Sequence, residues 1–161
     1  MTAIGLIGCG GMAQDVVAAL RGADMADGLR IVGALARPGR GDEARAKLCG
    51  VDIVEALDEL LTRKPTLVAE VAGQAAVAEH ADAVLRRGID CLLISVGALA
   101  DAALLLRLKS AARDGNSRIL LPAGAAFEAS GQQCISAQRV IVERPVFDRF
   151  LELFVAAAKK L

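Results

Sequence analysis

Small residues near the start of the chain have the types and spacing that suit the binding of a phosphate group. Residues 3–7 form an apolar run that predicts a buried strand, and Gly8, Gly10 and Ala13 follow it. In the pattern Gly-x-Gly-x-x-Gly/Ala the first glycine permits a tight turn and the second lets the backbone approach a pyrophosphate. The third small residue lets a helix pack closely on the strand. These three residues predict a dinucleotide-binding turn, and an ordinary structural turn is the alternative.

The residues after this turn predict the helix that such a site needs. Gly11 and Met12 stand in its first turn, and Val16, Val17 and Leu20 recur at helical spacing. The free amides and the positive dipole end of a helix N-terminus stabilise phosphate charge. We therefore expect Gly11 and Met12 to join the glycine turn in binding the cofactor.

Two arginines stand where the choice between NAD and NADP is made in such domains. Residues 29–36 predict a second strand, and Arg37 and Arg40 follow it. An acidic residue near this strand end holds the ribose 2′-hydroxyl of NAD, whereas a basic one suits the 2′-phosphate of NADP. Arg37 therefore favours NADP, or the use of both cofactors, and the alternative is a solvated basic loop.

The following residues alternate between short apolar runs and helical patterns. Strands are predicted at 51–54, 67–71, 91–96 and 118–121, and helices at 42–48, around Leu57, at 75–87 and at 101–113. This order predicts an α/β fold, with a doubly wound, mostly parallel, Rossmann-like sheet and right-handed connections. Residues 1–125 would form this dinucleotide-binding domain.

Several of the predicted strands stop at small residues. Ala72 and Gly73 follow one strand, and Val96 and Gly97 end another. Ligands of open parallel sheets bind beyond the carboxyl ends of the strands, where small side chains leave room. Together with the glycine turn, these residues predict a groove in which all four contact the cofactor.

Composition excludes several classes of partner. The 161 residues carry no net charge, which gives no reason to expect nucleic acid or an acidic membrane as a partner. No apolar run is long enough to span a bilayer. The four cysteines are widely spaced and have no zinc-ligand pattern, so they suggest a reduced, cytoplasmic protein without a metal site. The sole histidine, His80, is expected to be a partly exposed helix residue far from any strand end.

The chain changes character at about residue 126. All four phenylalanines, Phe127, Phe147, Phe150 and Phe154, lie beyond that point. Residues 140–142 suggest a strand tip, and the apolar residues from Phe147 onward recur at the spacing of an amphipathic helix. Residues 126–161 are therefore expected to add a C-terminal strand-helix appendage. If its apolar stripe finds no room on the sheet, it would drive formation of a homodimer.

Residues 1–125 resemble the N-terminal domain of the L-aspartate dehydrogenase family. The resemblance rests on Ile-Gly-Cys-Gly-Gly-Met-Ala at 7–13, Val-Ala-Glu-Val-Ala-Gly-Gln at 68–74, Ser-Val-Gly-Ala-Leu-Ala-Asp at 95–101 and Leu-Pro-Ala-Gly-Ala at 121–125. It implies binding of NAD or NADP, with Ala125 and the glycine turn against the cofactor. The family acts on aspartate, or on oxaloacetate with ammonia, and its catalytic histidine lies in a second domain with no counterpart here.

The tail resembles a segment of the aldehyde dehydrogenase superfamily. The matching residues are Phe-Glu-Ala-Ser-Gly-Gln-Gln-Cys at 127–134, Arg-Val-Ile-Val at 139–142 and Val-Phe-Asp-Arg-Phe at 146–150. The resemblance implies that Cys134 matches the nucleophilic thiol that attacks an aldehyde. The alternative is an inert or merely oxidisable cysteine, because the general base and the oxyanion asparagine of that superfamily are missing.

Three functions follow from these observations. The first is an NAD(P)-binding oxidoreductase domain of the aspartate dehydrogenase type, catalytically incomplete as this chain. The second is an aldehyde-oxidising enzyme that uses Cys134. The third is a non-enzymatic interaction module in which Phe147, Phe150 and Phe154 dock onto a partner.

Overall fold

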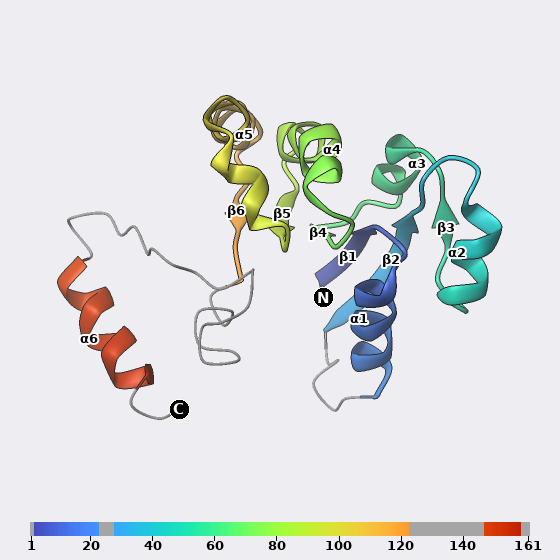
Figure 1. Ribbon diagram of the computed structural model, residues 1–161, viewed down its shortest axis with the longest axis horizontal. Coiled ribbons are helices and arrows are strands. Elements are labelled where there is room, and N and C mark those ends of the chain that lie inside the picture. The colour runs from blue at the N-terminus through green and yellow to red at the C-terminus, as the bar shows by residue number, and fades with distance from the viewer. Residues whose placement is uncertain (1, 23–27, 123–146, 159–161) are drawn as a thin grey trace. The chain divides into compact units, whose positions relative to one another are not determined.

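The computed structural model describes residues 2–22, 28–122 and 147–158 (Figure 1). The chain divides into two compact units, one ending at Pro122 and the other starting at Ala123.

The first unit alternates strands and helices along its length. Its strands are β1 (Thr2–Ile7), β2 (Leu29–Leu35), β3 (Ile53–Val54), β4 (Leu67–Glu70), β5 (Asp90–Leu93) and β6 (Ile119–Leu120). Its helices are α1 (Gly11–Gly22), α2 (Gly41–Lys47), α3 (Leu57–Thr62), α4 (Gln74–Arg86), the short 3₁₀ helix η2 (Val96–Ala100) and α5 (Ala102–Gly115). In the second unit the described element is α6 (Phe147–Ala158).

The six strands form one sheet in the order β3-β2-β1-β4-β5-β6, and every pairing between them is parallel. Chain order runs outward from β1 to β3 and then returns to β4 on the other side of β1. The strand order therefore reverses between β1 and β4. In open α/β sheets this reversal creates a crevice beyond the carboxyl ends of the strands.

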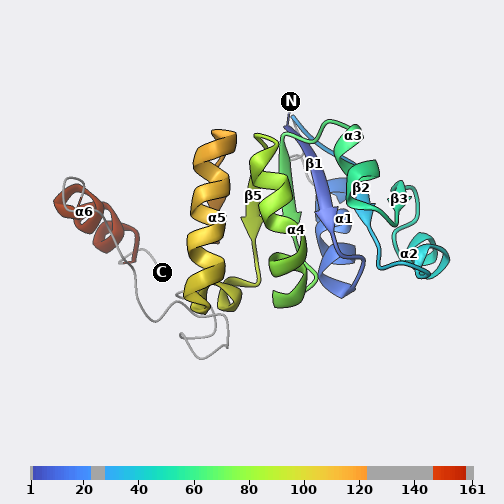
Figure 2. The ribbon, with the colours of Figure 1, turned by 90° about the horizontal axis from the view of Figure 1, so that it is seen from above.

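Helices cover both faces of the sheet. On one face Ala13 and Val17 of α1 and Ala44 of α2 pack with Leu6 and Ala34 of the sheet. On the other face the buried residues of α3, α4 and α5 pack with side chains of alternate strand positions, among them Ile7, Leu35, Val68 and Cys91. Figures 1 and 2 show α3, α4 and α5 together on one side of the sheet and α1 on the other. This two-layer cover buries an aliphatic core.

The predicted α/β, doubly wound sheet is confirmed, and its elements lie close to their predicted positions. One strand is an exception. The strand expected at 91–96 ends at Leu93, and Val96 lies in η2 instead. The reason is the side chain of Glu70, whose carboxylate accepts hydrogen bonds from the backbone N–H and the hydroxyl of Ser95. These bonds draw the chain out of the sheet two residues after β5.

The C-terminal helix predicted from the phenylalanine spacing is confirmed as α6. The rings of Phe150 and Phe154 stack with their centroids 5.3 Å apart. Phe147, Leu151 and Val155 recur every four residues and are 41–45% exposed. The strand tip expected at 140–142 lies outside the described residues.

Candidate functional site

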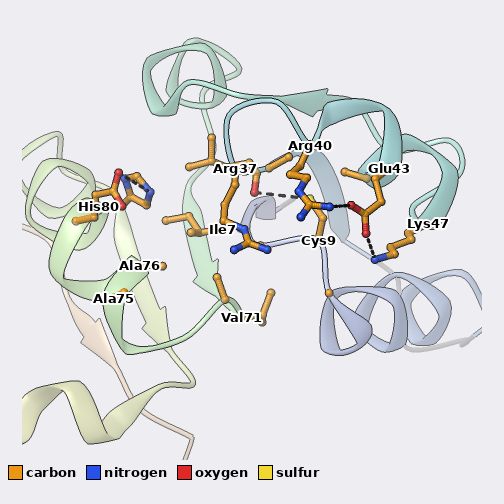
Figure 3. Close-up of a pocket in the computed structure, with 17 residues that line it drawn as sticks. Ile7, Cys9, Arg37, Arg40, Glu43, Lys47, Val71, Ala75, Ala76 and His80 are labelled. Atoms are coloured by element: carbon orange, nitrogen blue, oxygen red, sulfur yellow. Dashed lines mark hydrogen bonds and ion pairs between the residues drawn. The ribbon is translucent and has the colours of Figure 1, made fainter.

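A cavity of about 430 Å³ lies at the carboxyl ends of β1, β2 and β4, next to the point where the strand order reverses. This is the position at which doubly wound sheets bind their ligands. The cavity extends between α2 on one side and α4 on the other (Figure 3). Its wall is formed by Ile7, Gly8, Cys9, Gly10, Leu35, Ala36, Arg37, Arg40, Glu43, Ala44, Lys47, Val71, Ala72, Ala75, Ala76, Glu79 and His80.

The two glycines of the turn differ in what they do. Gly8 has φ +112°, and a Cβ added there would lie 2.8 Å from the Cβ of Ala72. The close approach of the two turns therefore excludes any side chain at this position. A Cβ added at Gly10 would meet nothing within 4 Å. Because Gly10 lines the cavity, its missing side chain leaves open space where a phosphate would approach the backbone.

The next three predicted residues form the start of α1. Gly11 is the first residue of the helix, and Met12 is 46% exposed. Ala13 is fully buried in the core between α1 and the sheet. Ala13 thus occupies the helix-packing position that the pattern assigns to it, whereas Gly11 and Met12 lie outside the cavity wall.

The charged side of the cavity comes from the β2–α2 loop and from α2. Glu43 accepts hydrogen bonds from Arg40 and from Lys47, each at 2.6 Å. The hydrogen bonds from Lys47 and then Arg40 hold the pKa of the Glu43 carboxyl below its ordinary value. Arg37 is exposed, and Figure 3 shows its side chain reaching toward the middle of the cavity. None of the ion pairs found within the described ranges involves Arg37.

A single side chain fixes the shape of this loop. The Glu55 carboxylate, just after β3, accepts hydrogen bonds from the backbone N–H groups of Gly39 at 2.6 Å and Gly41 at 2.9 Å. The loop between Arg37 and α2 is therefore held to β3 at two points. This restraint limits where the Arg37 guanidinium can reach.

The other small-residue turns lie near the cavity but contribute to its wall unequally. Ala72 lines it, whereas Gly73, Val96 and Gly97 do not. Gly97 is close to the start of α4, since a Cβ there would lie 2.6 Å from Nε2 of Gln74. The turns after β4 and β5 are thus neighbours, and a contact of their residues with the cofactor stays a prediction.

Cys9 lines the cavity, and its side chain is a titratable thiol. Burial raises the pKa of the Cys9 thiol above its ordinary value, against the smaller effect of the Lys47 charge. Because its pKa is raised, the Cys9 side chain is a neutral thiol at pH 7. The thiol donates to the carbonyl oxygen of Leu35 at 3.6 Å.

His80 was expected to lie inside a helix, and it is a residue of α4. It lines the cavity that begins at the ends of β1 and β4, because α4 starts directly after β4 and runs along the cavity wall. The expectation that His80 is partly exposed is confirmed, with 20% of the side chain accessible.

Sequence reasoning missed Glu43, Lys47, Glu79 and His80 as wall residues. A local signal was present, since Arg40, Glu43 and Lys47 are spaced by three and four residues and so share one helix face. That spacing could not show that this face meets a cavity, because the neighbouring wall comes from residues far along the chain.

Two predicted residues cannot be placed. Ala125 and Cys134 lie outside the described residues, so their roles stay predictions. Within 2–22, 28–122 and 147–158, no group of three or more His, Cys, Asp or Glu side chains could hold a metal ion. No helix in the same ranges is long and apolar enough to cross a membrane.

Strand order, glycine turn and switch-point cavity together define a nicotinamide-dinucleotide-binding domain of a dehydrogenase. The chain belongs to the family of homoserine dehydrogenase NAD-binding domains, whose family model matches residues 8–122. A second, shorter match, of the aldehyde dehydrogenase family model, covers residues 111–161, most of which lie outside the described part.

Comparison with known proteins confirms the resemblance to L-aspartate dehydrogenases. L-aspartate dehydrogenase 2 of Bordetella bronchiseptica is 46% identical over 122 residues, which is 76% of this chain and 45% of the relative. Aspartate dehydrogenase of Thermotoga maritima has a similar fold, with a TM-score of 0.60 and 21% identity over 80% of this chain and 48% of its own. The WlbA dehydrogenase of Bordetella pertussis, solved with NADH and UDP-GlcNAcA, also has a similar fold, with a TM-score of 0.66 and 17% identity. This match covers 80% of this chain and 38% of the WlbA chain. The chain thus spans less than half the length of these proteins.

Proposed function

We propose that this domain binds NADP in preference to NAD. The observation that carries the proposal is the charge arrangement at the end of β2. Arg40 and Lys47 are both paired with Glu43, whereas Arg37 reaches into the cavity and enters no ion pair found in the described part of the chain. An unpaired guanidinium at this strand end suits the 2′-phosphate of NADP, which it can bind through two parallel hydrogen bonds.

We further propose that this domain is of the cofactor-binding kind found in L-aspartate dehydrogenases, in which the cofactor supplies or accepts a hydride. The support is the 46% identity to an L-aspartate dehydrogenase across the domain. Glycine backbone, small apolar side chains and Arg37 in the cavity wall suit the binding of a cofactor, and the chain spans 45% of that relative. We therefore propose that the chain as given binds cofactor without turning over aspartate.

A calorimetric titration of the chain with NADP(H) and NAD(H) tests both proposals. Saturable binding of NADP, tighter than that of NAD, is expected. Arg37→Asp should lower the affinity for NADP by about tenfold or more, because it removes a charge-assisted hydrogen bond to the 2′-phosphate and adds a carboxylate that repels it. The same variant should bind NAD at least as well as the wild type, since a carboxylate can accept a bond from the ribose 2′-hydroxyl. Absorbance of NADPH with oxaloacetate and ammonia should stay constant.

Lys109→Glu is the matched control, because it reverses a charge on the exposed face of α5, away from the cavity. It should leave both affinities unchanged. If Arg37→Asp and Lys109→Glu lost the same NADP affinity, the loss would come from the change in net charge. That result would overturn the role of Arg37. No binding of either cofactor at millimolar concentration would overturn the proposed function itself.

The other expectations from the sequence stay proposals. They are a cytoplasmic location, no nucleic-acid or membrane partner, a homodimer formed through the apolar stripe of α6, and a role of Cys134 as an aldehyde-attacking nucleophile. The match of the aldehyde dehydrogenase family model to residues 111–161 supports the last one. We rank it lower, because no general base or oxyanion-binding asparagine accompanies Cys134 in the segment that resembles that superfamily.

A further inference from the structure

Glu70, the last residue of β4, is the one charged side chain that is buried within the described ranges, with 1% of its surface exposed. A buried carboxylate is costly unless hydrogen bonds compensate the lost hydration. Its position is equally notable, since it lies at the carboxyl end of a central strand beside the cavity wall formed by Val71 and Ala72.

The carboxylate of Glu70 links two turns that are far apart in sequence. Oε1 accepts hydrogen bonds from the backbone N–H of Ala72 at 2.7 Å and of Gly73 at 2.6 Å. The Ser95 hydroxyl donates to the same oxygen at 3.0 Å, and the Ser95 backbone N–H donates to Oε2 at 3.0 Å. One side chain therefore holds the turn after β4 and the turn after β5 against each other.

The four hydrogen bonds suit a carboxylate side chain as acceptor. Three of the four donors are backbone N–H groups, which can only donate, so both oxygens must act as acceptors. The neighbouring Cys91 responds to this charge: burial, and then the negative charge of Glu70, raise the pKa of its thiol to about 12. Three hydrogen bonds to Oε1 and one to Oε2 come from two chain segments, and Ser95 lies 25 residues from Glu70 in the sequence, so the carboxylate connects two distant turns rather than closing one local turn.

The two turns lie on the half of the sheet opposite to Arg37. A dinucleotide fold consists of two mononucleotide-binding halves, and the adenosine ribose binds at the end of the second strand. Here that strand is β2, so the adenosine half lies over β1 to β3. The nicotinamide half consequently lies over β4 to β6, where the turns joined by Glu70 begin.

We propose that Glu70 is a positioning residue for the nicotinamide half of the cofactor. Its carboxylate sets the spacing of the Ala72-Gly73 and Ser95-Val96 turns, and these turns receive the nicotinamide ribose and ring. The inference rests on the proposed cofactor binding. It gives Glu70 a role in the nicotinamide half of the site, to which no side chain of the cavity wall has been assigned.

Glu70→Gln tests the inference, because the amide keeps the shape of the carboxylate but replaces one acceptor by a donor. The amide nitrogen must then face at least one backbone N–H. Fewer hydrogen bonds are lost when the amide nitrogen takes the place of Oε2, whose single donor is the Ser95 N–H. The turn after β5 should therefore lose its backbone hydrogen bond, and the turn after β4 should retain both of its own. Ser95→Ala is the milder second variant, since it removes only the hydroxyl bond.

The readout is the affinity for NADPH compared with that for 2′,5′-ADP, which carries the adenosine half alone. Glu70→Gln should weaken NADPH by about tenfold and 2′,5′-ADP by less than about twofold. Ser95→Ala should shift the ratio in the same direction by a smaller factor. The emission of bound NADPH, which reports on the surroundings of the reduced ring, should move toward that of free NADPH in both variants.

Glu59→Gln is the control, an equal charge change on the exposed side of α3 that should alter neither ligand. Equal weakening of NADPH and 2′,5′-ADP in Glu70→Gln and in Ser95→Ala would mean a purely structural role and overturn the inference. Unchanged NADPH affinity and emission in both variants would overturn it as well. Failure of the wild type to bind either NADPH or NADH would instead reject the cofactor site on which the inference depends.

Discussion

At the scale of single residues, Gly8 and Gly10 separate the demands of the fold from those of the ligand. Gly10→Ala adds a methyl group that meets no protein atom within 4 Å. We expect its free energy of unfolding to stay the same or rise by about 0.4–1 kcal/mol, because alanine restricts the unfolded chain. Its affinity for NADPH should fall, since the methyl group occupies the space through which the pyrophosphate approaches the backbone.

Gly8→Ala should give the opposite result for stability. Its φ of +112° and the 2.8 Å approach to Ala72 impose strain, and we expect a loss of about 1–3 kcal/mol in the free energy of unfolding. Urea denaturation and NADPH titration of both variants provide the measurement. If Gly10→Ala bound NADPH as tightly as the wild type, the cofactor would not approach the backbone at this residue.

At the scale of elements, an ion pair joins β5 to β6 at the end of the sheet opposite to the cavity. Arg118 donates to Asp90 through its backbone N–H at 2.8 Å, and through Nε and Nη2 at 3.0 and 2.6 Å. The side-chain hydrogen bond from Arg118 is the largest cause that lowers the pKa of Asp90 below its ordinary value of 3.8. A lowered pKa means that the pair stabilises the fold above the unfolded-state pKa and stops doing so as the pH falls through the folded-state pKa.

We therefore predict that Asp90→Asn lowers the free energy of unfolding at pH 7 by no more than about 1 kcal/mol, the range of solvent-accessible pairs. The difference from the wild type should shrink below pH 3.8, where the Asp90 carboxyl becomes protonated in the wild type as well. Urea denaturation across this pH range measures it. Asp15→Asn on the exposed face of α1 is the control, and a difference that grew on acidification would contradict the prediction. Cofactor affinity should not change, since the pair lies away from the cavity.

At the scale of the whole molecule, the exposed stripe of α6 is the feature that bears on assembly. Phe147, Leu151 and Val155 lie on one helix face and are 41–45% exposed. Burial of such a stripe against a second copy would remove apolar surface from water. We predict a concentration-dependent homodimer by sedimentation velocity, and a monomer for Leu151→Glu.

Leu106→Glu provides the matched control, because Leu106 is an exposed leucine on α5 of the first unit, 68% accessible. Leu106→Glu should form the dimer over the same concentration range as the wild type. A wild-type protein that sediments as a monomer at all concentrations would contradict the prediction and leave the stripe for another role.

The sequence by itself determined the elements and the kind of ligand. The glycine turn, the alternation of apolar runs with helical patterns and the stripe beginning at Phe147 are local patterns, and each depends on neighbours within a few residues. For the same reason the position of Arg37 after β2 was predictable. A resemblance carried by four short motifs identified the family to which the comparisons also point.

Only the tertiary structure decided how distant residues meet. Because β4 lies next to β1, His80 of α4 and Lys47 of α2 line the same cavity from opposite sides. No local pattern in the sequence predicts this arrangement. The pairing of β4 with β5 sets Glu70 beside Ser95, and the hydrogen bonds between them end β5 at Leu93. The tertiary structure also shows that the Arg37 side chain faces the cavity. The physical reason is that hydrogen bonds and ion pairs depend on distance in space, and the strand order sets that distance.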